Sequence, residues 1–229
     1  MDKWYEVPGK AGTNVIYSRV RLVRNLKEYP FPGRLTKEQS AELSEKLLGG
    51  LTGIASMDRM QYRFTHLERM GDLEKTALLE RRAINRSVMK KKDPTGMILS
   101  EDESTAILLN GDDHVRIQTL QTGLTLEQLY ERADKIDDYI SERFDYAFDE
   151  KYGYLTSFPT NVGTGLRAAV VLHLPMLSKN KNFNSLVADM GRFGTQVRGV
   201  YGEGAENFGS LYQISNQKTL GQTEREIID

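Results

Sequence analysis

Apolar residues recur at helical spacing in several segments of the chain. The clearest is the segment 125–144, where apolar side chains repeat every three or four residues at Leu126, Leu129, Ala133, Ile136 and Ile140. Two segments begin with a capping-box pattern, a threonine followed three residues later by glutamine: Thr36 with Gln39, and Thr125 with Gln128. We therefore predict helices over residues 36–51, 72–82, 125–144 and 182–193, with a further helix beginning at residue 223.

Strand-like segments lie between these helices. In residues 15–22, Arg19 and Arg21 alternate with Val20 and Leu22, which predicts a strand with arginines on one face and apolar side chains on the other. Apolar runs predict further strands at 97–100, 104–109, 168–174 and 195–198, with a hairpin turn at 101–103. Runs of adjacent strands with inserted helices favour an α+β fold, a largely antiparallel sheet backed by helices.

Length and composition narrow the class of protein. The chain has 229 residues, of which 39% are hydrophobic, and no repeat or long linker divides it, so we expect a single domain over residues 1–229. The 31 Lys and Arg are matched by 32 Asp and Glu, which argues against a nucleic-acid partner. The sequence has no cysteine, which excludes disulfides, thiolate metal sites and a catalytic thiol. No apolar run approaches the ~20 residues that span a bilayer and no signal-peptide pattern is present, so we expect no membrane partner and a cytoplasmic location.

The segment from Tyr154 to Arg167 carries the first candidate chemistry. Gly163 and Gly165 permit positive φ, which can turn backbone N–H groups toward an anion, and Arg167 stands at the start of an apolar run. The guanidinium of arginine can hold a phosphate with two N–H groups at once. A glycine turn before a strand is usually only a turn, so this segment alone is a weak indication of phosphate binding.

Arginine recurs beside glycine or acidic residues in three other strand-and-loop segments. They contain Arg19 and Arg21; Arg116, which follows Asp112 and Asp113; and Arg198, which precedes a glycine loop with Glu203. Each arginine taken alone is more often a solvated strand residue. Four such segments together indicate a converging anion site, and the balanced net charge suits a small focused site better than a broad cationic surface.

Several motifs, in this order, resemble the catalytic domain of the phosphagen (guanidino) kinases, the family of arginine and creatine kinases. The motifs are Ser18-Arg-Val-Arg-Leu-Val-Arg-Asn25, Asp113-His-Val-Arg-Ile-Gln118, Pro159-Thr-Asn-Val-Gly-Thr-Gly-Leu-Arg-Ala168, Arg198-Gly-Val-Tyr-Gly-Glu-Gly204, and Tyr212-Gln-Ile-Ser-Asn-Gln217 followed by Thr219-Leu-Gly221. Tyr201 and the string from Gln213 to Gln217 make the chain most similar to the bacterial protein-arginine kinases. The resemblance implies the fold of that catalytic domain.

The resemblance also implies a nucleotide site. In the family five arginines hold the nucleotide phosphates, and every matching position here is an arginine: Arg19, Arg21, Arg116, Arg167 and Arg198. Ser18, which opens the first motif, is included in the predicted nucleotide site. The implied nucleotides are ATP and ADP, with Mg²⁺ carried mainly by nucleotide oxygens and water, so no protein metal site is expected. The competing interpretation is that these arginines are structural and pair with Asp and Glu.

On the acceptor side, the family uses two carboxylates that orient the guanidinium and accept its proton. The resemblance assigns these catalytic roles to Glu203 and to Asp112, although the family has a longer glutamate at the second position. Phe158 stands where the family usually has a reactive cysteine, and its ring either stacks on a guanidinium or packs into the core. Arg82 falls near a family histidine that stacks on the nucleotide, but we expect it at a solvated helix end.

The function implied by the resemblance is ATP-dependent phosphorylation of arginine side chains of proteins by in-line phosphoryl transfer. Two alternatives stay open: a nucleotide-binding pseudokinase, in which Asp112 and Phe158 disable transfer, and a metabolic kinase of free arginine. The expected partners are the nucleotide, an arginine-containing protein substrate, and an activator protein or a second copy of the chain. The protein-arginine kinases also carry a C-terminal domain, and the chain ends before that domain would begin.

Overall fold

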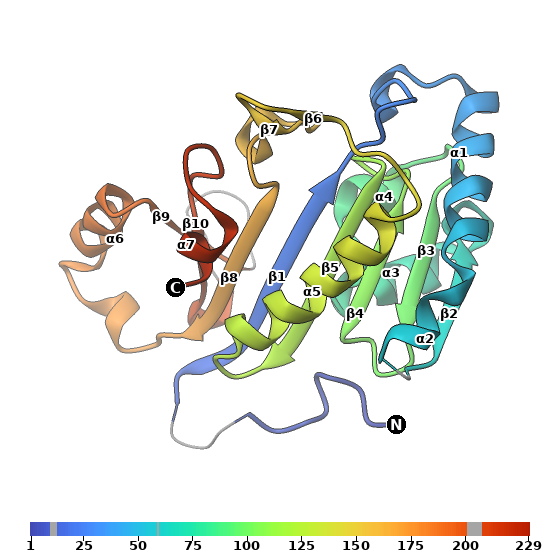
Figure 1. The fold of residues 1–229 in the computed structure, drawn as a ribbon. Coiled ribbons are helices and arrows are strands. Elements are labelled where there is room, and N and C mark those ends of the chain that lie inside the picture. Colours follow the sequence, from blue (N-terminus) through green and yellow to red (C-terminus); the bar gives the residue numbers. More distant parts are fainter. Residues whose placement is uncertain (10–12, 59, 201–207) are drawn as a thin grey trace.

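A computed structural model describes residues 1–9, 13–58, 60–200 and 208–229 (Figure 1). In these residues eight strands form one antiparallel sheet in the order β2-β3-β4-β5-β1-β8-β10-β9. The strands are β1 (Val15–Arg24), β2 (Tyr62–His66), β3 (Gly96–Ser100), β4 (Thr105–Leu109), β5 (Val115–Thr122), β8 (Leu166–His173), β9 (Thr195–Gly199) and β10 (Leu211–Asn216). A separate ribbon pairs β6 (Phe148–Asp149) with β7 (Gly153–Tyr154).

The helices are α1 (Lys37–Gly50), α2 (Ala55–Asp58), α3 (Asp72–Glu80), α4 (Arg86–Lys90), α5 (Leu126–Ser141), α6 (Phe183–Arg192) and α7 (Glu224–Ile228). The predicted capping box at α1 is confirmed, because the Thr36 hydroxyl accepts from the Gln39 N–H at 3.2 Å and the Gln39 side chain accepts from the Thr36 N–H at 3.0 Å. The predicted capping box at Thr125 is wrong. The backbone of Thr125 (φ −141°, ψ 30°) departs from the extended cap geometry, and its N–H donates to the Ser18 hydroxyl at 3.1 Å.

The main core lies between the sheet and α5, α1 and α7, which confirms the predicted α+β class. Figure 1 shows α5 lying diagonally across β1 and β5, with α1 beside it. The sheet contributes apolar side chains such as Val20, Leu22 and Ile117, and α5 contributes Leu129 and Ile136, all at most 1% exposed. Burying each such side chain stabilises the fold by about 1.5–3 kcal/mol, which is why the alternation along β1 fixes this face inward.

The opposite face of the sheet is covered by two smaller apolar clusters. Side chains of the α3–α4 segment, including Leu78 and Val88, pack on β3 and β4. Trp4, from the N-terminal arm, packs with Tyr17 and Val171 at one end of β1 and β8. The central strands beside these two clusters are left for polar side chains, and the site described below occupies them.

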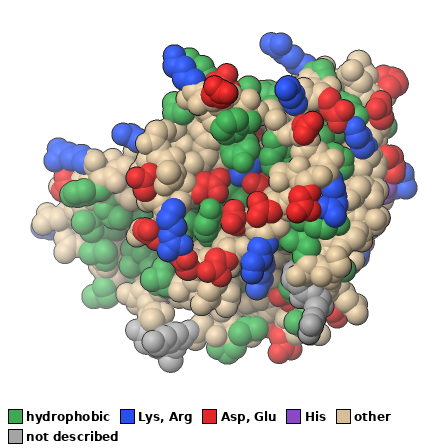
Figure 2. Space-filling view, viewed as in Figure 1, with side chains coloured by type: hydrophobic (Ala, Val, Ile, Leu, Met, Phe, Trp, Pro, Cys, Tyr) green, Lys and Arg blue, Asp and Glu red, His purple; other side chains and the backbone are tan. Residues whose placement is uncertain are grey.

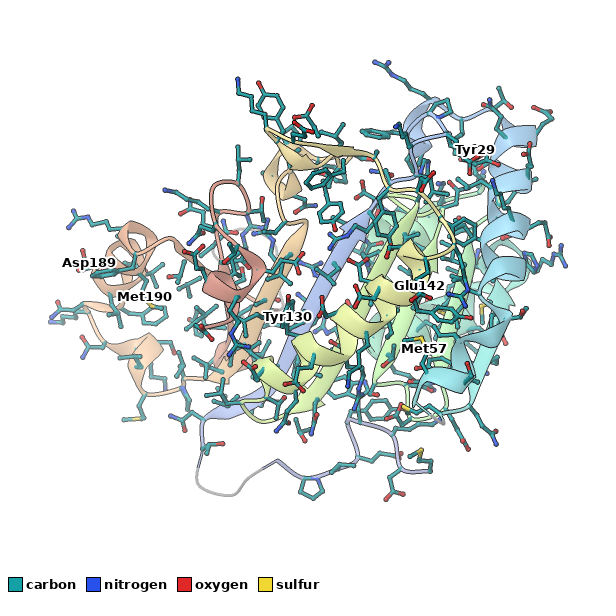
Figure 3. The ribbon with its side chains drawn as sticks, viewed as in Figure 1. Tyr29, Met57, Tyr130, Glu142, Asp189 and Met190 are labelled. Atoms are coloured by element: carbon teal, nitrogen blue, oxygen red, sulfur yellow. The ribbon has the colours of Figure 1, made fainter. Side chains whose placement is uncertain are left out.

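The margins of the molecule are polar or only lightly packed. Acidic and basic side chains intermix on the face that α5 covers (Figure 2). Asp189 and Met190 lie on α6, which stands at the β9 margin far from Tyr29 beside α1 (Figure 3), and α6 has no buried residue. In the described part of the chain, none of the helices combines the length and apolar composition needed to cross a bilayer.

Candidate active site

Five arginines from four strands gather on the sheet face opposite α5: Arg19, Arg21, Arg116, Arg167 and Arg198. The antiparallel register sets Arg21 of β1 directly beside Arg167 of β8. Arg198 pairs with Gln213 of β10, and the Gln213 side chain accepts a hydrogen bond of 2.6 Å from Arg19. The sheet therefore brings together segments that are far apart in the sequence.

Two neighbouring cavities open onto this arginine face. The larger, about 400 Å³, is lined by Arg19, Arg21, Arg82 and Arg116 together with apolar residues of the α3–α4 segment. The smaller, about 170 Å³, is lined by Arg21, Arg116 and Arg167 and also by Asp112 and Phe158. Arg21, Asn85 and Arg116 line both cavities, so the two cavities adjoin each other.

The arginines repel one another, and the carboxylates of Asp112 and Asp113 offset only part of that repulsion at Arg116. In the described residues, the Nε atoms of Arg19, Arg21 and Arg116 are buried without a hydrogen-bond partner. Burial, and then the charges of Arg19, Arg116 and Arg167, hold the pKa of Arg21 well below its ordinary value. Burial and the charge of Arg19 lower the pKa of Arg116 to about 10. Such a cluster is complementary to a polyanion, because each buried N–H gains an acceptor and the repulsion is relieved.

The hydrogen-bond partners of Arg19 and Arg167 are uncharged groups. The guanidinium of Arg167 donates to the carbonyls of Asn216 at 2.8 Å and Thr160 at 3.1 Å, and to the side chain of Asn161 at 3.2 Å. These bonds orient the guanidinium without cancelling its charge. Burial and the nearby Arg198 lower the pKa of Arg167, as expected for a cation held among cations.

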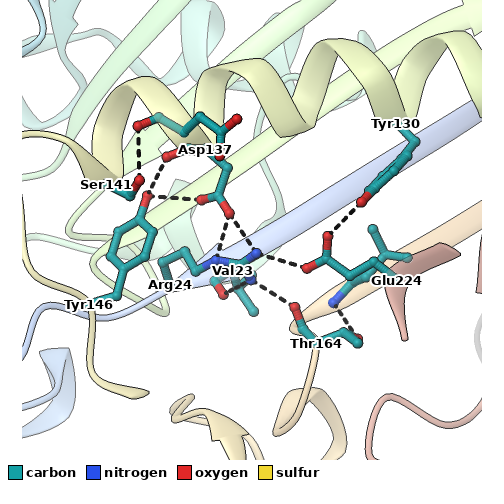
Figure 4. Close-up of polar contacts among 10 residues, drawn as sticks. Val23, Arg24, Tyr130, Asp137, Ser141, Tyr146, Thr164 and Glu224 are labelled. Atoms are coloured by element: carbon teal, nitrogen blue, oxygen red, sulfur yellow. Dashed lines mark hydrogen bonds and ion pairs between the residues drawn. The ribbon is translucent and has the colours of Figure 1, made fainter. Parts of the chain in front are cut away.

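Arg24 is a contrasting case: it is a structural arginine on the face of β1 that the helices cover. Its guanidinium is 1% exposed and donates to Asp137 at 2.6 and 2.9 Å and to Glu224 at 3.0 Å (Figure 4). The guanidinium carbon also lies 3.6 Å from the Tyr154 ring centroid. Burial lowers its pKa, but the two carboxylates outweigh burial and raise the pKa of Arg24 above its ordinary value. The interpretation of the motif arginines as Asp- and Glu-paired structural residues therefore fits Arg24 and not Arg21.

The glycine turn before β8 positions Arg167, and two of its N–H groups bond within the protein. Gly163 (φ 110°) and Gly165 (φ 64°) confirm the predicted positive φ. The N–H of Gly163 donates to the Tyr154 carbonyl at 3.3 Å, and the N–H of Thr164 donates to the Thr219 carbonyl at 2.9 Å. The N–H groups of Gly163 and Thr164 are therefore satisfied within the protein and do not face a phosphate.

Asp112 and Asp113 have different roles. Asp112 is half-buried, lines the smaller cavity, and accepts hydrogen bonds from Asn85 at 2.7 Å and Ser87 at 2.5 Å. Asp113 is 2% exposed, and one of its oxygens accepts from the Asn25 side chain and from the Ser157 N–H, both at 2.7 Å. Asp113 thus ties the end of β1 to the segment before the glycine turn, while Asp112 is placed where a ligand can meet it.

His114 is a buried structural residue. Its Nδ1 accepts from the Leu26 N–H at 2.9 Å, so the proton of the neutral ring is on Nε2, which donates to the Pro30 carbonyl at 3.0 Å. Burial lowers its pKa from 6.5 to about 4. The imidazole therefore stays neutral in the folded protein at a pH where the unfolded chain already binds a proton.

We expect stability to fall as the pH drops from about 6.5 to about 4, because protonation of His114 favours the unfolded chain in this window. The contribution is present above pH 6.5, and its loss amounts to about 3 kcal/mol at most. Urea unfolding at several pH values measures the loss, and an NMR titration of the His114 ring assigns it. A His114 imidazole that titrates near 6.5 in the folded protein would contradict this prediction.

Three other sequence-based predictions change. Ser18 is fully buried on the α5 side, where its hydroxyl donates to the Gly123 carbonyl at 2.7 Å, so we remove it from the nucleotide site. Phe158 is 50% exposed at the smaller cavity, which excludes packing into the core. Arg82 lies just past the end of α3, as expected, but its side chain is half-buried at the larger cavity and not fully solvated. It adopts a positive φ of 69°, lines the larger cavity, and its charge contributes to lowering the pKa of Arg19.

The predicted catalytic residue Glu203 and the motif residue Tyr201 lie outside the described residues. The sequence interpretation missed Asn85 and Ser87, which contact Asp112 from the start of α4. The pattern Asn-x-Ser ahead of Val88 was the available signal, because asparagine is a favoured N-cap residue. Within the described ranges, no group of three or more His, Cys, Asp or Glu side chains is arranged to hold a metal ion.

Comparison with known proteins agrees with this geometry. A family profile described as ATP:guanido phosphotransferase, C-terminal catalytic domain, matches residues 45–229. The chain is 39% identical over 228 residues to a protein-arginine kinase of Halothermothrix orenii, and 40% identical over 229 residues to one of Bacillus velezensis. Both alignments cover 100% of this chain, but only 64% and 63% of the two relatives, so the chain spans slightly less than two thirds of their length.

Solved structures give the same result for the fold. Lombricine kinase superposes with a TM-score of 0.80 at 25% identity, covering 93% of this chain and 62% of that chain. The duplicated taurocyamine kinase from Schistosoma mansoni, solved with bound transition state analog components, superposes with a TM-score of 0.82 at 28% identity, covering 93% and 31%. The matched profile, the relatives and the fold agree with the five-arginine face, and the chain belongs to the ATP:guanido phosphotransferase family.

Proposed function

We propose that this protein transfers the γ-phosphoryl group of ATP to the guanidinium group of arginine side chains in proteins. The observation that carries the proposal is the set of buried, mutually repelling arginines around Arg21, which opens onto a cavity containing Asp112. A polyphosphate supplies the negative charge that the arginines need, and a guanidinium supplies the positive charge that complements Asp112. The name protein-arginine kinase, given to the relatives from Halothermothrix orenii and Bacillus velezensis, supports the same choice of acceptor.

The proposed reaction requires little covalent chemistry from the protein. The bond between the γ-phosphorus and the bridging oxygen breaks as a guanidino nitrogen forms a bond to phosphorus, and ADP leaves. Negative charge spreads over the equatorial phosphoryl oxygens, where arginine N–H groups fixed in advance stabilise it. The guanidinium loses one proton as its nitrogen attacks, and Asp112, with Glu203 as a second carboxylate, is the proposed acceptor.

The acceptor cavity suits the end of an arginine side chain. The half-exposed ring of Phe158 and the carboxylate of Asp112 both line this space of about 170 Å³. A planar guanidinium can stack on an aromatic ring while its N–H groups donate in pairs to a carboxylate. Phe158 therefore provides a stacking surface at the position where a cysteine would provide a thiolate.

The side chains that line the two cavities fit Mg²⁺ that arrives on the nucleotide, because the arginines are matched to phosphate and Asp112 already accepts two hydrogen bonds from the start of α4. When bound, Mg²⁺ would neutralise charge on the phosphate oxygens. We also propose that residues 1–229 act as one catalytic domain, and that the protein works in the cytoplasm, where ATP is the abundant donor.

A nucleotide-binding protein without transfer activity is the second candidate. The specific observation that favours it is that each oxygen of Asp112 already accepts a hydrogen bond, from Asn85 and from Ser87. Aspartate is also one methylene shorter than the family's glutamate, and a misplacement of about 1 Å can cost on the order of 10²-fold in rate. The two candidates share the nucleotide site and differ only in what happens at Asp112.

The test is to incubate the protein with ATP, Mg²⁺ and an unfolded arginine-rich protein. We expect acid-labile phosphate on arginine, and none on a matched acceptor in which lysine replaces every arginine. Asp112→Asn is expected to lose about 10²-fold in transfer rate, since it removes a proton acceptor, while ATP still raises its Tm. ATP binding without transfer to protein or to free arginine would establish the second candidate, and transfer only to free arginine would establish a metabolic kinase.

A further inference from the structure

The start of α4 contacts both oxygens of the acceptor carboxylate. The Asn85 side-chain amide donates to Oδ2 of Asp112 at 2.7 Å, and the Ser87 hydroxyl donates to Oδ1 at 2.5 Å. Building on the proposed function, we propose that Ser87 and Asn85 are positioning residues that fix the Asp112 carboxylate toward the acceptor guanidinium. They act through Asp112 and need no contact with the substrate.

The orientation of Asn85 is set by its place in the helix. Asn85 is the N-cap of α4, and its Oδ1 accepts from the Val88 N–H at 3.0 Å. The amide nitrogen must therefore point away from the helix, toward Asp112. Val88 is 2% exposed and packs in the apolar cluster on β3 and β4, so the core of the protein anchors this end of α4.

Ser87 makes a contact that the stability of the fold does not explain. The side chain is exposed, so water could satisfy its hydroxyl without any protein partner. The hydroxyl lies 2.5 Å from Asp112 Oδ1 and 3.1 Å from Asn85 Oδ1, and its single proton serves the shorter contact. An exposed serine that directs its proton to a cavity-lining carboxylate indicates a role in the site.

The end of α4 holds the backbone of the same turn. The ammonium group of Lys91, which follows α4, donates to the carbonyls of Asn110 at 2.7 Å and Gly111 at 2.9 Å. Asn110 is fully buried at a positive φ of 55°, a conformation that persists only where the surroundings enforce it. Both the backbone and the side chain of Asp112 are therefore set by α4 and its flanks.

Fixing the carboxylate leaves it able to bind the acceptor. A carboxylate offers about four lone-pair positions, of which Asn85 and Ser87 occupy two. The other two can accept paired N–H groups of a guanidinium, and the carboxylate is held from rotating away. For a short aspartate, this restraint matters because the rate of transfer depends on alignment to about 1 Å.

The experiment compares Ser87→Ala, Ser87→Thr and the control Ser56→Ala, which removes an exposed serine hydroxyl on α2 that donates to the Gly53 carbonyl at 2.7 Å. We expect Ser87→Ala to lower kcat for transfer about tenfold, with KM for ATP and the ATP-dependent rise in Tm unchanged. Ser87→Thr keeps the hydroxyl and should retain most of the rate, and Ser56→Ala should match the wild type. An unchanged kcat in Ser87→Ala would overturn the proposal.

A double-mutant cycle tests whether Ser87 acts through Asp112. In the Asp112→Asn background, Ser87→Ala should cause no further loss, whereas an independent tenfold loss would overturn the proposal. The NMR signal of the Asp112 carboxyl carbon gives a readout that needs no activity. A signal that does not move in Ser87→Ala overturns the inference in any case. If the signal moves in Ser87→Ala but the wild-type protein shows no transfer activity, only the proposed function is overturned.

Discussion

Replacing Arg21 with methionine is expected to abolish most of the rise in Tm that ATP gives the wild-type protein, while the nucleotide-free variant stays at least as stable. Methionine keeps much of the side-chain volume and removes a charge that repels Arg19, Arg116 and Arg167. Because Arg21 has no ion-pair partner among the described residues, its removal leaves no carboxylate unpaired. ATP, in contrast, loses a charge-assisted partner, which costs about 2–5 kcal/mol, or roughly 30- to 5000-fold in affinity.

Thermal unfolding with and without ATP and Mg²⁺ measures both effects at once. A ligand at 100 times its Kd stabilises a protein by about 2.7 kcal/mol, so loss of affinity on this scale removes most of the shift. Arg63→Met is the matched control, because Arg63 is an exposed arginine on the edge strand β2 and lines neither arginine cavity. A variant Arg21→Met that melts much earlier than the wild type yet keeps the ATP shift would show that Arg21 is structural.

The sequence pattern predicted those parts of the fold that depend on neighbours along the chain. The helical periodicity of α5 and the capping box of α1 are local, and the structure contains both helices close to the expected bounds. The strand order depends on contacts between distant segments, because β1 lies between β5 and β8. The hydrophobic pattern along the chain does not indicate which strands pair with β1. The strand β2 was missed, since none of its residues is buried and its apolar pattern is weak.

The candidate site was predictable in its residue types and less so in their roles. Alternation along β1 correctly placed Arg19 and Arg21 on one face, and the resemblance supplied the other arginines. The same alternation places Ser18 and Arg24 on the opposite face, where the structure finds them bonded to Gly123 and Asp137. The face of the strand on which a residue lies therefore distinguishes the site arginines from Ser18 and Arg24, although all of them belong to one motif. The contacts of Asp112 with α4 could not be predicted, because they join segments paired only by the tertiary fold.

Arg24→Met is expected to lower the free energy of unfolding by about 3–5 kcal/mol, the opposite of the effect of Arg21→Met on the same strand. Arg24 neutralises two partly or fully buried carboxylates, Asp137 and Glu224, and donates to the Thr164 carbonyl at 2.7 Å. Methionine leaves both carboxylates in a desolvated setting without their cation. A loss of this size is a large fraction of the 5–15 kcal/mol that holds a typical domain folded.

Urea unfolding at neutral pH measures the loss, with Arg21→Met as the matched variant and Arg225→Met, which breaks an exposed pair with Glu127, as the surface control. The difference in free energy of unfolding between Arg24→Met and the wild type should become smaller as the pH falls. Burial raises the pKa of Glu224, and Arg24 opposes that rise, so removing Arg24 raises the folded-state pKa further. An acid whose folded-state pKa is raised gains stability when protonated, which relieves the unpaired charge at low pH. If Arg24→Met and Arg21→Met were equally stable at neutral pH and at every lower pH measured, the division of the β1 arginines into one structural and one ligand-binding group would fail.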